Sequence, residues 1–475
     1  MKQYGHSIKA FFSGALISTL LTAPLLSHAG EQRVIDIEAI KQKEILGIVD
    51  IYELAVVNDA DFLAAKWKKK AGMQVVPIAR AKFLPKIKLS ANTTLNDSES
   101  EYLEENPAIS GFDLAPHYNT NGYTISLVQP LINVKNIFHW PEAKIKEKRT
   151  ELQYMLAEHQ LIGKVGEVYV GKIVADENLT VAKAQLNAIK EHLNQAKLSF
   201  ELGSVTITDT HEAQAAYDVA YSRFLAAQTA LKNADHHLIT LTGHDNANLL
   251  RIRSKLPLDI EEFQLPELDE LRDVAVQANP QLNLTRISHA LAQISLRLEQ
   301  AKHLPTLDLV AAIGENNTNG GVFGGGSDTE FYNVGLQLNL PIFSGGSVHN
   351  TAKKKRYLLE EQKRRLTQAE RNVELELFES YHNVELVKTQ LAALNQAVES
   401  TRSSLESTKL GFEVGERTGL DVLNVQNGYF SALRDRANAQ YQYILVVLTL
   451  NLTLGIISEE DIYKLGDLIS DYAEI

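Results

Sequence analysis

The residues of this chain that could carry out chemistry are few, and their spacing fits no catalytic or metal site. The sequence has no cysteine, so it holds no thiolate nucleophile, no disulfide and no cysteine-ligated metal centre. His211 and Glu212 begin like a zinc-binding His-Glu-x-x-His helix, but the fifth position is Ala215, which is no ligand. We interpret the adjacent His236 and His237 as helix-surface residues. We therefore expect neither an enzyme nor a bound metal or other cofactor.

Two short motifs place a carboxylate three residues after a threonine. Thr206 is followed by Asp209, and Thr418 is followed by Asp421. In a capping box of this spacing, the threonine side chain and the carboxylate each bind a backbone N–H group at the start of a helix. An acidic side chain at that place also complements the helix dipole. The pattern favours a capping role for both acids and is compatible with a second role.

The two motifs belong to a tandem repeat that runs through the chain. An offset of 212 residues relates Gly203 to Gly415 and Asp209 to Asp421. The copies are about 210 residues long. The predicted divisions are residues 30–265 for the first repeat, 266–460 for the second and 461–475 for a C-terminal tail.

Each copy is expected to contain a helical segment, a pair of strands and two long helices. Apolar residues recur at three- and four-residue spacing among residues that favour helices. The expected helices cover about 50–81, 141–200 and 207–242 in the first copy, and about 267–302, 347–410 and 419–455 in the second. A helix of 60 residues extends about 90 Å. Such helices must pack side by side, as in a coiled coil or a ring of helices.

Four segments alternate apolar and polar residues in the manner of strands. They cover about 84–96, 121–132, 304–315 and 329–343. Each is long enough to cross an outer membrane with one lipid face and one wet face, although a soluble sheet with one packed side has the same alternation. Four strands cannot close a barrel, and an open edge is not viable in lipid. Membrane-spanning strands would therefore require oligomerisation, and a trimer with twelve strands is the economical solution.

The N-terminal segment has the features of a secretory signal peptide. Lys2 and Lys9 precede an apolar stretch over 10–26, and a small-residue cleavage site predicts removal of residues 1–29. No cysteine follows this site, which excludes a lipid anchor of the bacterial lipoprotein kind. The formal net charge of -12 argues against a nucleic-acid partner. We interpret the basic runs Lys68–Lys70 and Lys353–Arg356 as solvated helix faces.

The signal peptide, the duplicated unit of long helices and the two-strand insertion in each unit closely resemble the TolC family of trimeric outer-membrane efflux channels. The resemblance covers nearly the whole mature chain and includes Leu410–Asn424, His303–Leu309 and Leu336–Gly346. It implies a mainly α fold with a membrane β-barrel, in which four strands per chain complete a 12-stranded trimeric barrel in the outer membrane of a Gram-negative bacterium. A long α-helical barrel would continue this through the periplasm, and the tail at 461–475 would join an equatorial belt.

By the same resemblance, the protein would be the exit duct of a tripartite export system. Its partners would be two further copies of itself, outer-membrane lipid, a periplasmic adaptor (membrane fusion) protein and an inner-membrane ABC or proton-driven pump. The cargo would be drugs, small toxic compounds, secreted polypeptides or several of these. The alternative is a trimeric, surface-exposed structural or adhesive coiled coil, which predicts strict heptads without a duplication or lipid-facing strands.

The resemblance also assigns residues to the periplasmic end, which the family closes by polar links. The residues at those positions are Thr208, Asp209, Phe412 and Arg417. Asp421 would form a ring of three carboxylates in the aperture. Asp209 and Arg417 each follow a glycine turn, so an ion pair or a water-linked contact between them is plausible.

The adaptor is expected to dock at the two glycine turns, Gly203 and Gly415. The chain departs from the family pattern at two places, because Phe412 replaces a tyrosine and Asn424 replaces an aspartate. The tyrosine hydroxyl link is therefore missing, and the acidic ring is single.

Overall fold

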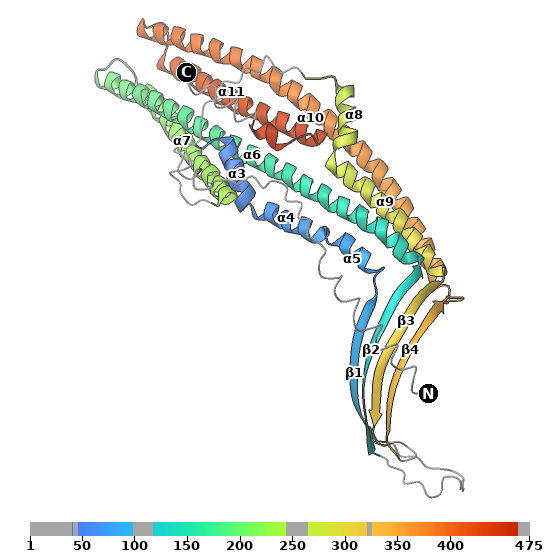
Figure 1. Ribbon diagram of the computed structural model, residues 1–475. Helices are drawn as coiled ribbons and strands as arrows, with labels where there is room; N and C mark the ends of the chain where they lie inside the picture. The colour runs from blue at the N-terminus through green and yellow to red at the C-terminus, as the bar shows by residue number, and fades with distance from the viewer. Residues whose placement is uncertain (1–39, 41–45, 98–116, 244–264, 321–324, 464–475) are drawn as a thin grey trace. The chain divides into compact units, whose positions relative to one another are not determined.

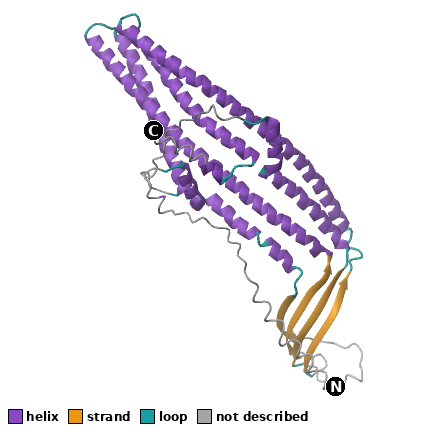
Figure 2. Ribbon diagram, turned by 45° about the horizontal axis from the view of Figure 1, so that its top comes forward, coloured by secondary structure: helices purple, strands orange, loops and turns teal. Residues whose placement is uncertain are grey.

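The computed structural model describes residue 40 and the ranges 46–97, 117–243, 265–320 and 325–463, so the predicted signal peptide lies outside the described residues. In chain order the elements are α3 (Ile48–Asn58), α4 (Ala60–Gly72), α5 (Val75–Ala81), β1 (Lys86–Asp97), β2 (His117–Asn133), α6 (Val134–Glu201), α7 (Ile207–Thr242), α8 (Leu268–Ala278), α9 (Pro280–Gln300), the 3-10 helix η3 (Ala301–His303), β3 (Thr306–Thr318), β4 (Ser327–Asn339), α10 (Ser347–Glu413) and α11 (Gly419–Leu454) (Figure 1). The strands gather at one end of the long helices (Figure 2).

The two halves of the chain repeat the same order of elements. Short helices lead into two strands, then into one very long helix and a second helix of about half its length. The very long helices α6 and α10 have 68 and 67 residues, and α7 and α11 have 36 each. At a rise of about 1.5 Å per residue, α6 alone extends about 100 Å.

The four strands form one antiparallel sheet in the order β1-β2-β3-β4, which confirms the prediction of four strands per chain. β2 runs longer than expected and shifts its register between Pro130 and Ile132, where a bulge accommodates the proline without a ladder N–H. β4 ends at Asn339, four residues earlier than expected. Pro341, two residues further on, has no backbone N–H to continue the ladder.

The sheet is exposed on its apolar face and open at both edges. On the edge strand β1, Ile87 and Leu89 are 70% and 66% exposed, and on the edge strand β4, Tyr332 and Val334 are 72% and 69% exposed. Because only β2 and β3 are paired on both sides, the outer strands keep unpaired backbone groups. A sheet of this kind needs both a covering for its face and further strands at its edges.

The helix α6 begins earlier than its sequence predicts. It starts at Val134, so Pro141 lies inside it, whereas the helix was expected to begin at about residue 141. The side chain of Asn133 caps the start by accepting a hydrogen bond from the N–H of Asn136 (3.3 Å). Pro141 is the eighth residue of the helix and has no N–H to donate to the carbonyl of Ile137, so this backbone hydrogen bond is lost.

Two expected helical segments are each broken at a capping residue, at positions 220 residues apart, and the first is broken again at residues 73–74, between α4 and α5. Asp59 separates α3 from α4 and Asn279 separates α8 from α9, both with extended backbone. The Asp59 side chain accepts from the N–H of Phe62 (2.8 Å), and that of Asn279 accepts from the N–H of Leu282 (2.9 Å). These capping side chains compete with helix continuation and start a new helix instead.

The long helices pack side by side, as their length requires. α6 lies against α7, α9 and α11, and α10 lies against α9 and α11. The buried residues of α10 are Val373, Leu377, Ser380, Val384, Val387, Leu391, Val398 and Leu405. They recur at steps of three, four and seven residues, which is the seam of a coiled coil. Among the described residues, no helix is long and apolar enough to cross a membrane.

The start of the predicted C-terminal tail lies against the first helices. The hydroxyl of Tyr463 donates to Glu53 of α3 (3.3 Å), and just before the tail Glu459 accepts from the hydroxyl of Tyr52 (2.8 Å). The rest of the tail, from residue 464, is outside the described residues. These contacts join the chain after α11 to α3.

Candidate functional site

Two exposed turns join the long helices in pairs, and the sequence-predicted site residues lie around them. Gly203 (φ 75°) follows α6 and Gly415 (φ 83°) follows α10, both in the left-handed region that favours glycine. The N–H groups of Ser204 and Glu416 each donate to the carbonyl five residues back, at 2.9 and 2.8 Å. Both turns therefore end their helix with the same hydrogen-bonded glycine motif.

Immediately after each turn, a capping box starts the next helix, as predicted. In the first, Asp209 Oδ2 accepts from the N–H and the hydroxyl of Thr206 (2.8 and 2.7 Å). In the second, Asp421 Oδ2 accepts from the N–H and the hydroxyl of Thr418 (both 2.9 Å). The backbone N–H of each aspartate donates in return to the threonine Oγ1, at 3.4 and 3.2 Å.

These hydrogen bonds lower the pKa of both carboxyl groups. For Asp209 the largest cause is the hydroxyl of Thr206, followed by the backbone N–H of the same residue. For Asp421 the largest cause is the backbone N–H of Thr418, followed by its hydroxyl, and the charge of Arg417 adds to them. Both aspartates are thus ionised near neutral pH. Each aspartate uses one carboxylate oxygen for the cap and leaves the other free. Capping therefore leaves a negative charge at the start of each helix.

The structure does not pair Asp209 with Arg417. Among the described residues, Arg417 makes no salt bridge, and its stem lies against Gly411 in its own turn. Thr208 is exposed at the start of α7. An ion pair between Asp209 and Arg417 inside one chain is therefore absent from the described part of the protein, and the two remain on separate turns.

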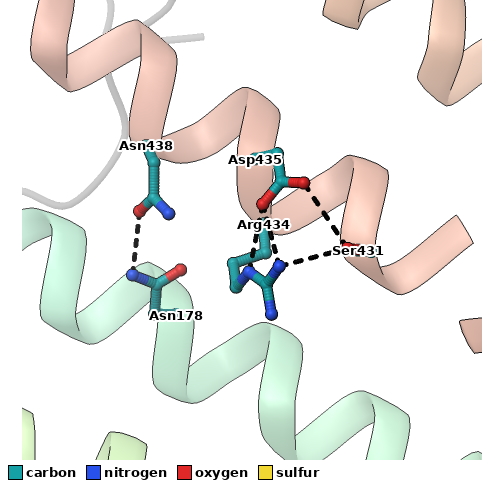
Figure 3. A network of polar contacts seen from close by, with 5 residues as sticks. All are labelled: Asn178, Ser431, Arg434, Asp435 and Asn438. Atoms are coloured by element: carbon teal, nitrogen blue, oxygen red, sulfur yellow. Dashed lines mark hydrogen bonds and ion pairs between the residues drawn. The ribbon is translucent and has the colours of Figure 1, made fainter. Parts of the chain in front are cut away.

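A polar seam between α6 and α11 lies next to the predicted residues. The Gln185 amide donates to Asn427 Oδ1 (2.9 Å), and the Asn178 amide donates to Asn438 Oδ1 (3.0 Å). Figure 3 shows the second bond. The seam contains little apolar surface at this end, where one small buried cluster joins Ile189 of α6 to α7 and α11. Amide hydrogen bonds therefore join the two helices here, beside the apolar packing of Leu448 and Leu452 of α11 against Gly166 and Gly163 of α6 further along.

A second polar group in the same figure belongs to α11 alone. Arg434 donates to Asp435 Oδ1 (2.9 Å) and to the hydroxyl of Ser431 (3.1 Å). This group neutralises the arginine one turn from Asn438. The bonds that cross between helices in this region are thus the amide pairs.

His192 extends the seam to the α10–α11 turn. Its ring lies 6.2 Å from the ring of Phe412, and a Cβ added to Gly419 would stand 3.2 Å from His192 Cε1. Within the described residues, neither of its buried ring nitrogens has a hydrogen-bond partner. Burial lowers the pKa of His192, so the ring is neutral near neutral pH. Phe412 is in this way brought against α6, although it lacks a hydroxyl to bond there.

The seam was not among the sequence-predicted features. Its signal is the spacing of Asn178, Gln185 and His192, which lie seven residues apart and so share one face of α6. Polar residues at a heptad position within a helix pair are a recognisable pattern. Their partners on α11 lie more than 200 residues away, so a local pattern does not identify them.

The described residues offer no alternative site of a catalytic or metal-binding kind. Among them, no group of three or more His, Cys, Asp or Glu residues is arranged to hold a metal ion. The features concentrated around the two turns are charges, caps and helix-to-helix links. Such features control how helices are held rather than how bonds are made.

Comparison with known proteins gives a consistent result. The sequence profile of the family described as "Outer membrane efflux protein" matches residues 51–244 and 271–456. The chain is 28% identical to the outer membrane protein TolC of Vibrio cholerae over 421 residues, which cover 87% of this chain and 92% of that protein. It is 27% identical to the alkaline protease secretion protein AprF of Pseudomonas aeruginosa over 427 residues, covering 88% and 86% of the two.

The fold is also that of solved structures. The outer membrane channel CmeC of Campylobacter jejuni superposes with a TM-score of 0.74 at 18% identity and covers 89% of each chain. VceC, an outer membrane protein of Vibrio cholerae, superposes with a TM-score of 0.70 at 17% identity over 86% of this chain and 96% of that one.

Proposed function

Because this chain belongs to the outer membrane efflux protein family, we propose that it is the outer-membrane exit duct of a tripartite export system. The protein is an outer-membrane channel and not an enzyme. It acts as a homotrimer together with a periplasmic adaptor protein and an inner-membrane pump. AprF, one of its relatives, is named for the secretion of a protease, so polypeptides are among the cargo classes that such a duct passes.

One observation carries this function. The four-stranded sheet has an exposed apolar face and two unpaired edges, and its second strand runs directly into a helix of 68 residues. Three copies joined edge to edge give twelve strands and leave no free edge. The helices that continue from these strands then line up around the same axis as a tunnel wall. The duplicated unit and the lipid-facing strands disfavour the adhesive coiled coil.

We propose that the periplasmic entrance lies at the α10–α11 turn and the α6–α7 turn. Arg417 is exposed in the turn just before α11, Asp421 lies half-buried in the first turn of α11, and Thr208 and Asp209 lie at the start of α7. In the trimer, Arg417 is available for a link to a neighbouring copy because it has no salt bridge among the described residues of its own chain. Asp421 supplies one carboxylate to a ring of three.

Phe412 takes part in closure through packing. Its ring meets His192 of α6 and not a hydrogen-bonding partner. The α6–α11 seam holds the α10–α11 pair against α6 in the same chain, and movement of that pair away from α6 breaks the seam.

The two glycine turns are the proposed docking points of the adaptor. Leu202 beside Gly203 is 75% exposed, and Val414 beside Gly415 is 66% exposed. Apolar side chains that stand at the tips of charged helices mark surfaces that a partner covers. The match between the two turns lets one adaptor surface recognise both.

Cross-linking in cells tests the docking points. The chain has no cysteine, and the left-handed conformation of the glycines argues against replacing them. Ser204→Cys and Glu416→Cys instead place a thiol at equivalent exposed positions beside each turn. We expect both to be cross-linked to a periplasmic protein, whereas Lys363→Cys on the exposed surface of α10 should not be. Equal labelling at all three positions would contradict docking at the turns.

Conductance tests the entrance. Arg417→Ser removes the charge proposed to link neighbouring copies, so single-channel conductance should rise while the trimer stays folded. Asp421→Ala should abolish block of the channel by cations, because the carboxylate ring concentrates them. Unchanged conductance in a folded Arg417→Ser trimer would count against its role in closure.

A further inference from the structure

A groove crosses four helices at some distance from the turns. It has a volume of about 640 Å³ and is lined by residues of α4, α6, α9 and α10. These helices lie side by side in that order, since α4 contacts α6, α6 contacts α9 and α9 contacts α10. Neighbouring helix axes are about 8–10 Å apart, so the first and the fourth are some 25–30 Å apart if the layer is flat. The groove therefore runs across the layer from α4 to α10.

The charges of the groove have one sign. Three cations line it: Lys68 of α4, Arg149 of α6 and Arg365 of α10. No aspartate or glutamate is among its lining residues, although the whole chain has a net charge of -12. The sequence had suggested only that Lys68 belongs to a solvated charge run, and the structure places it in this groove.

The remaining polar lining can bind anions as well. Side-chain amides from three helices face the same space, namely Gln153 of α6, Gln281 of α9 and Gln362 of α10. The hydroxyls of Thr285 and Ser288 also line it, but they donate to the carbonyls of Gln281 and Leu284 in their own helix. Side-chain amides donate hydrogen bonds to carboxylate and phosphate oxygens. The groove thus combines charge with neutral donors.

Two of the three cations are free to bind a ligand. Within the described residues, Lys68 and Arg149 take part in no salt bridge. Arg365 donates from Nε and Nη2 to Glu361 of its own helix (2.9 and 2.6 Å). By contrast, Lys164 and Arg272 outside the groove are paired with carboxylates of other helices.

We propose that this groove is a weak binding station for small organic anions that carry two or more carboxylate or phosphate groups and pass through the duct. The inference rests on the proposed function, because the groove faces a conduit only when copies close into a ring. The volume is that of a site for a small molecule. Transport requires a site that attracts cargo and also releases it, and exposed cations with neutral donors meet both conditions.

The test measures binding and conduction separately, with citrate as the probe. Citrate binding to the detergent-solubilised trimer is measured by calorimetry, and its block of the channel is measured in planar bilayers. The variant is the double substitution Lys68→Gln and Arg149→Gln. The control is Lys148→Gln with Lys363→Gln, which removes two exposed lysines of α6 and α10 that do not line the groove. A heat-sensitive trimer on gels verifies folding in each case.

The expected result is millimolar citrate binding to the wild type and partial block of its current. In water, the attraction between two opposite charges in contact is small. Losing one such ion pair weakens binding about fivefold. The double variant should therefore bind citrate roughly 20-fold more weakly, and the control should bind like the wild type. Wild-type trimer that conducts but does not bind citrate overturns the inference and leaves the proposed function intact. Citrate binding that survives the double substitution also overturns the proposed binding site. A trimer that binds citrate through the groove but does not conduct refutes the proposed channel function and leaves the binding site standing.

Discussion

Replacing Gln185 by methionine removes one hydrogen bond of the α6–α11 seam with little change in volume. The Gln185 amide is nearly buried and donates to Asn427 (2.9 Å). The substitution leaves Asn427 unpaired, and a hydrogen bond of this kind contributes about 1 kcal/mol to stability. If the three copies open together, the packed arrangement loses about 3 kcal/mol per trimer, which is an increase of roughly 100-fold in the ratio of open to closed channels.

The assay is the fraction of time that single channels spend at their larger conductance. Two variants control it. Gln185→Met combined with Asn427→Leu replaces both partners by apolar groups, which is close to neutral, so the open fraction should return most of the way to the wild type. Gln214→Met removes a similar amide bond, to Asp218 (3.0 Å), that lies within α7 and should leave the open fraction unchanged.

Two results would contradict a role of the α6–α11 seam in holding the channel closed. If folded Gln185→Met trimers open no more often than the wild type, the seam does not hold α11 against α6. If Gln214→Met has the same effect as Gln185→Met, the change reflects general loss of stability rather than a link between helices.

Three further predictions concern stability. Gly455→Ala should destabilise the trimer more than Gly243→Ala, as measured by thermal unfolding of the two variants. Both glycines have left-handed backbone, which costs about 1–2 kcal/mol for alanine. A Cβ at Gly455 would in addition lie 2.8 Å from a carbonyl oxygen of α8. Capping lowers the folded-state pKa of Asp209 and Asp421. The stability that these caps contribute is therefore present above the ordinary pKa of 3.8 and is lost as pH falls through the lower folded-state pKa. Helix content measured by circular dichroism should fall with decreasing pH in the wild type and fall less steeply when both residues are asparagine, and parallel curves would count against the caps. Leu377 is 2% exposed in the core that joins α10 to α8 and α11. Leu377→Ala should lower the free energy of unfolding by about 2–5 kcal/mol per chain, measured by denaturant unfolding. A decrease below about 1 kcal/mol would show that this core is loosely packed.

The sequence predicts best the elements whose ends carry their own signals. α7 spans Ile207–Thr242 and α11 spans Gly419–Leu454, within one residue of expectation. Each begins at a threonine capping box and ends at a left-handed glycine, Gly243 or Gly455. Such signals act over a few residues, so they are visible in the sequence alone.

The boundaries that differed depend on local competition between signals. The sequence pattern predicted that α6 begins at about residue 141, but the cap at Asn133 starts the helix earlier. Asp59 and Asn279 lie within apolar patterns of helical period and yet interrupt the helix, because their side chains bind the backbone of the next turn. In each case a single side chain overrides the periodicity.

The polar seam and the basic groove depend on contacts that no local pattern contains. Gln185 meets a residue 242 positions later, and the groove combines Lys68, Arg149 and Arg365 from three helices. In the sequence, each of these polar or charged residues looks like part of an ordinary solvated helix surface. Their grouping follows from how the repeats pack, which the sequence predicts only as side-by-side helices.

The central claim is that three copies close their open sheets into one conduit through a membrane. The most direct measurement is planar-bilayer recording from the detergent-extracted protein, together with its mass on gels before and after heating. The account predicts a heat-sensitive trimer that produces discrete, uniform current steps. A monomer that stays in solution without detergent and produces no current would contradict it.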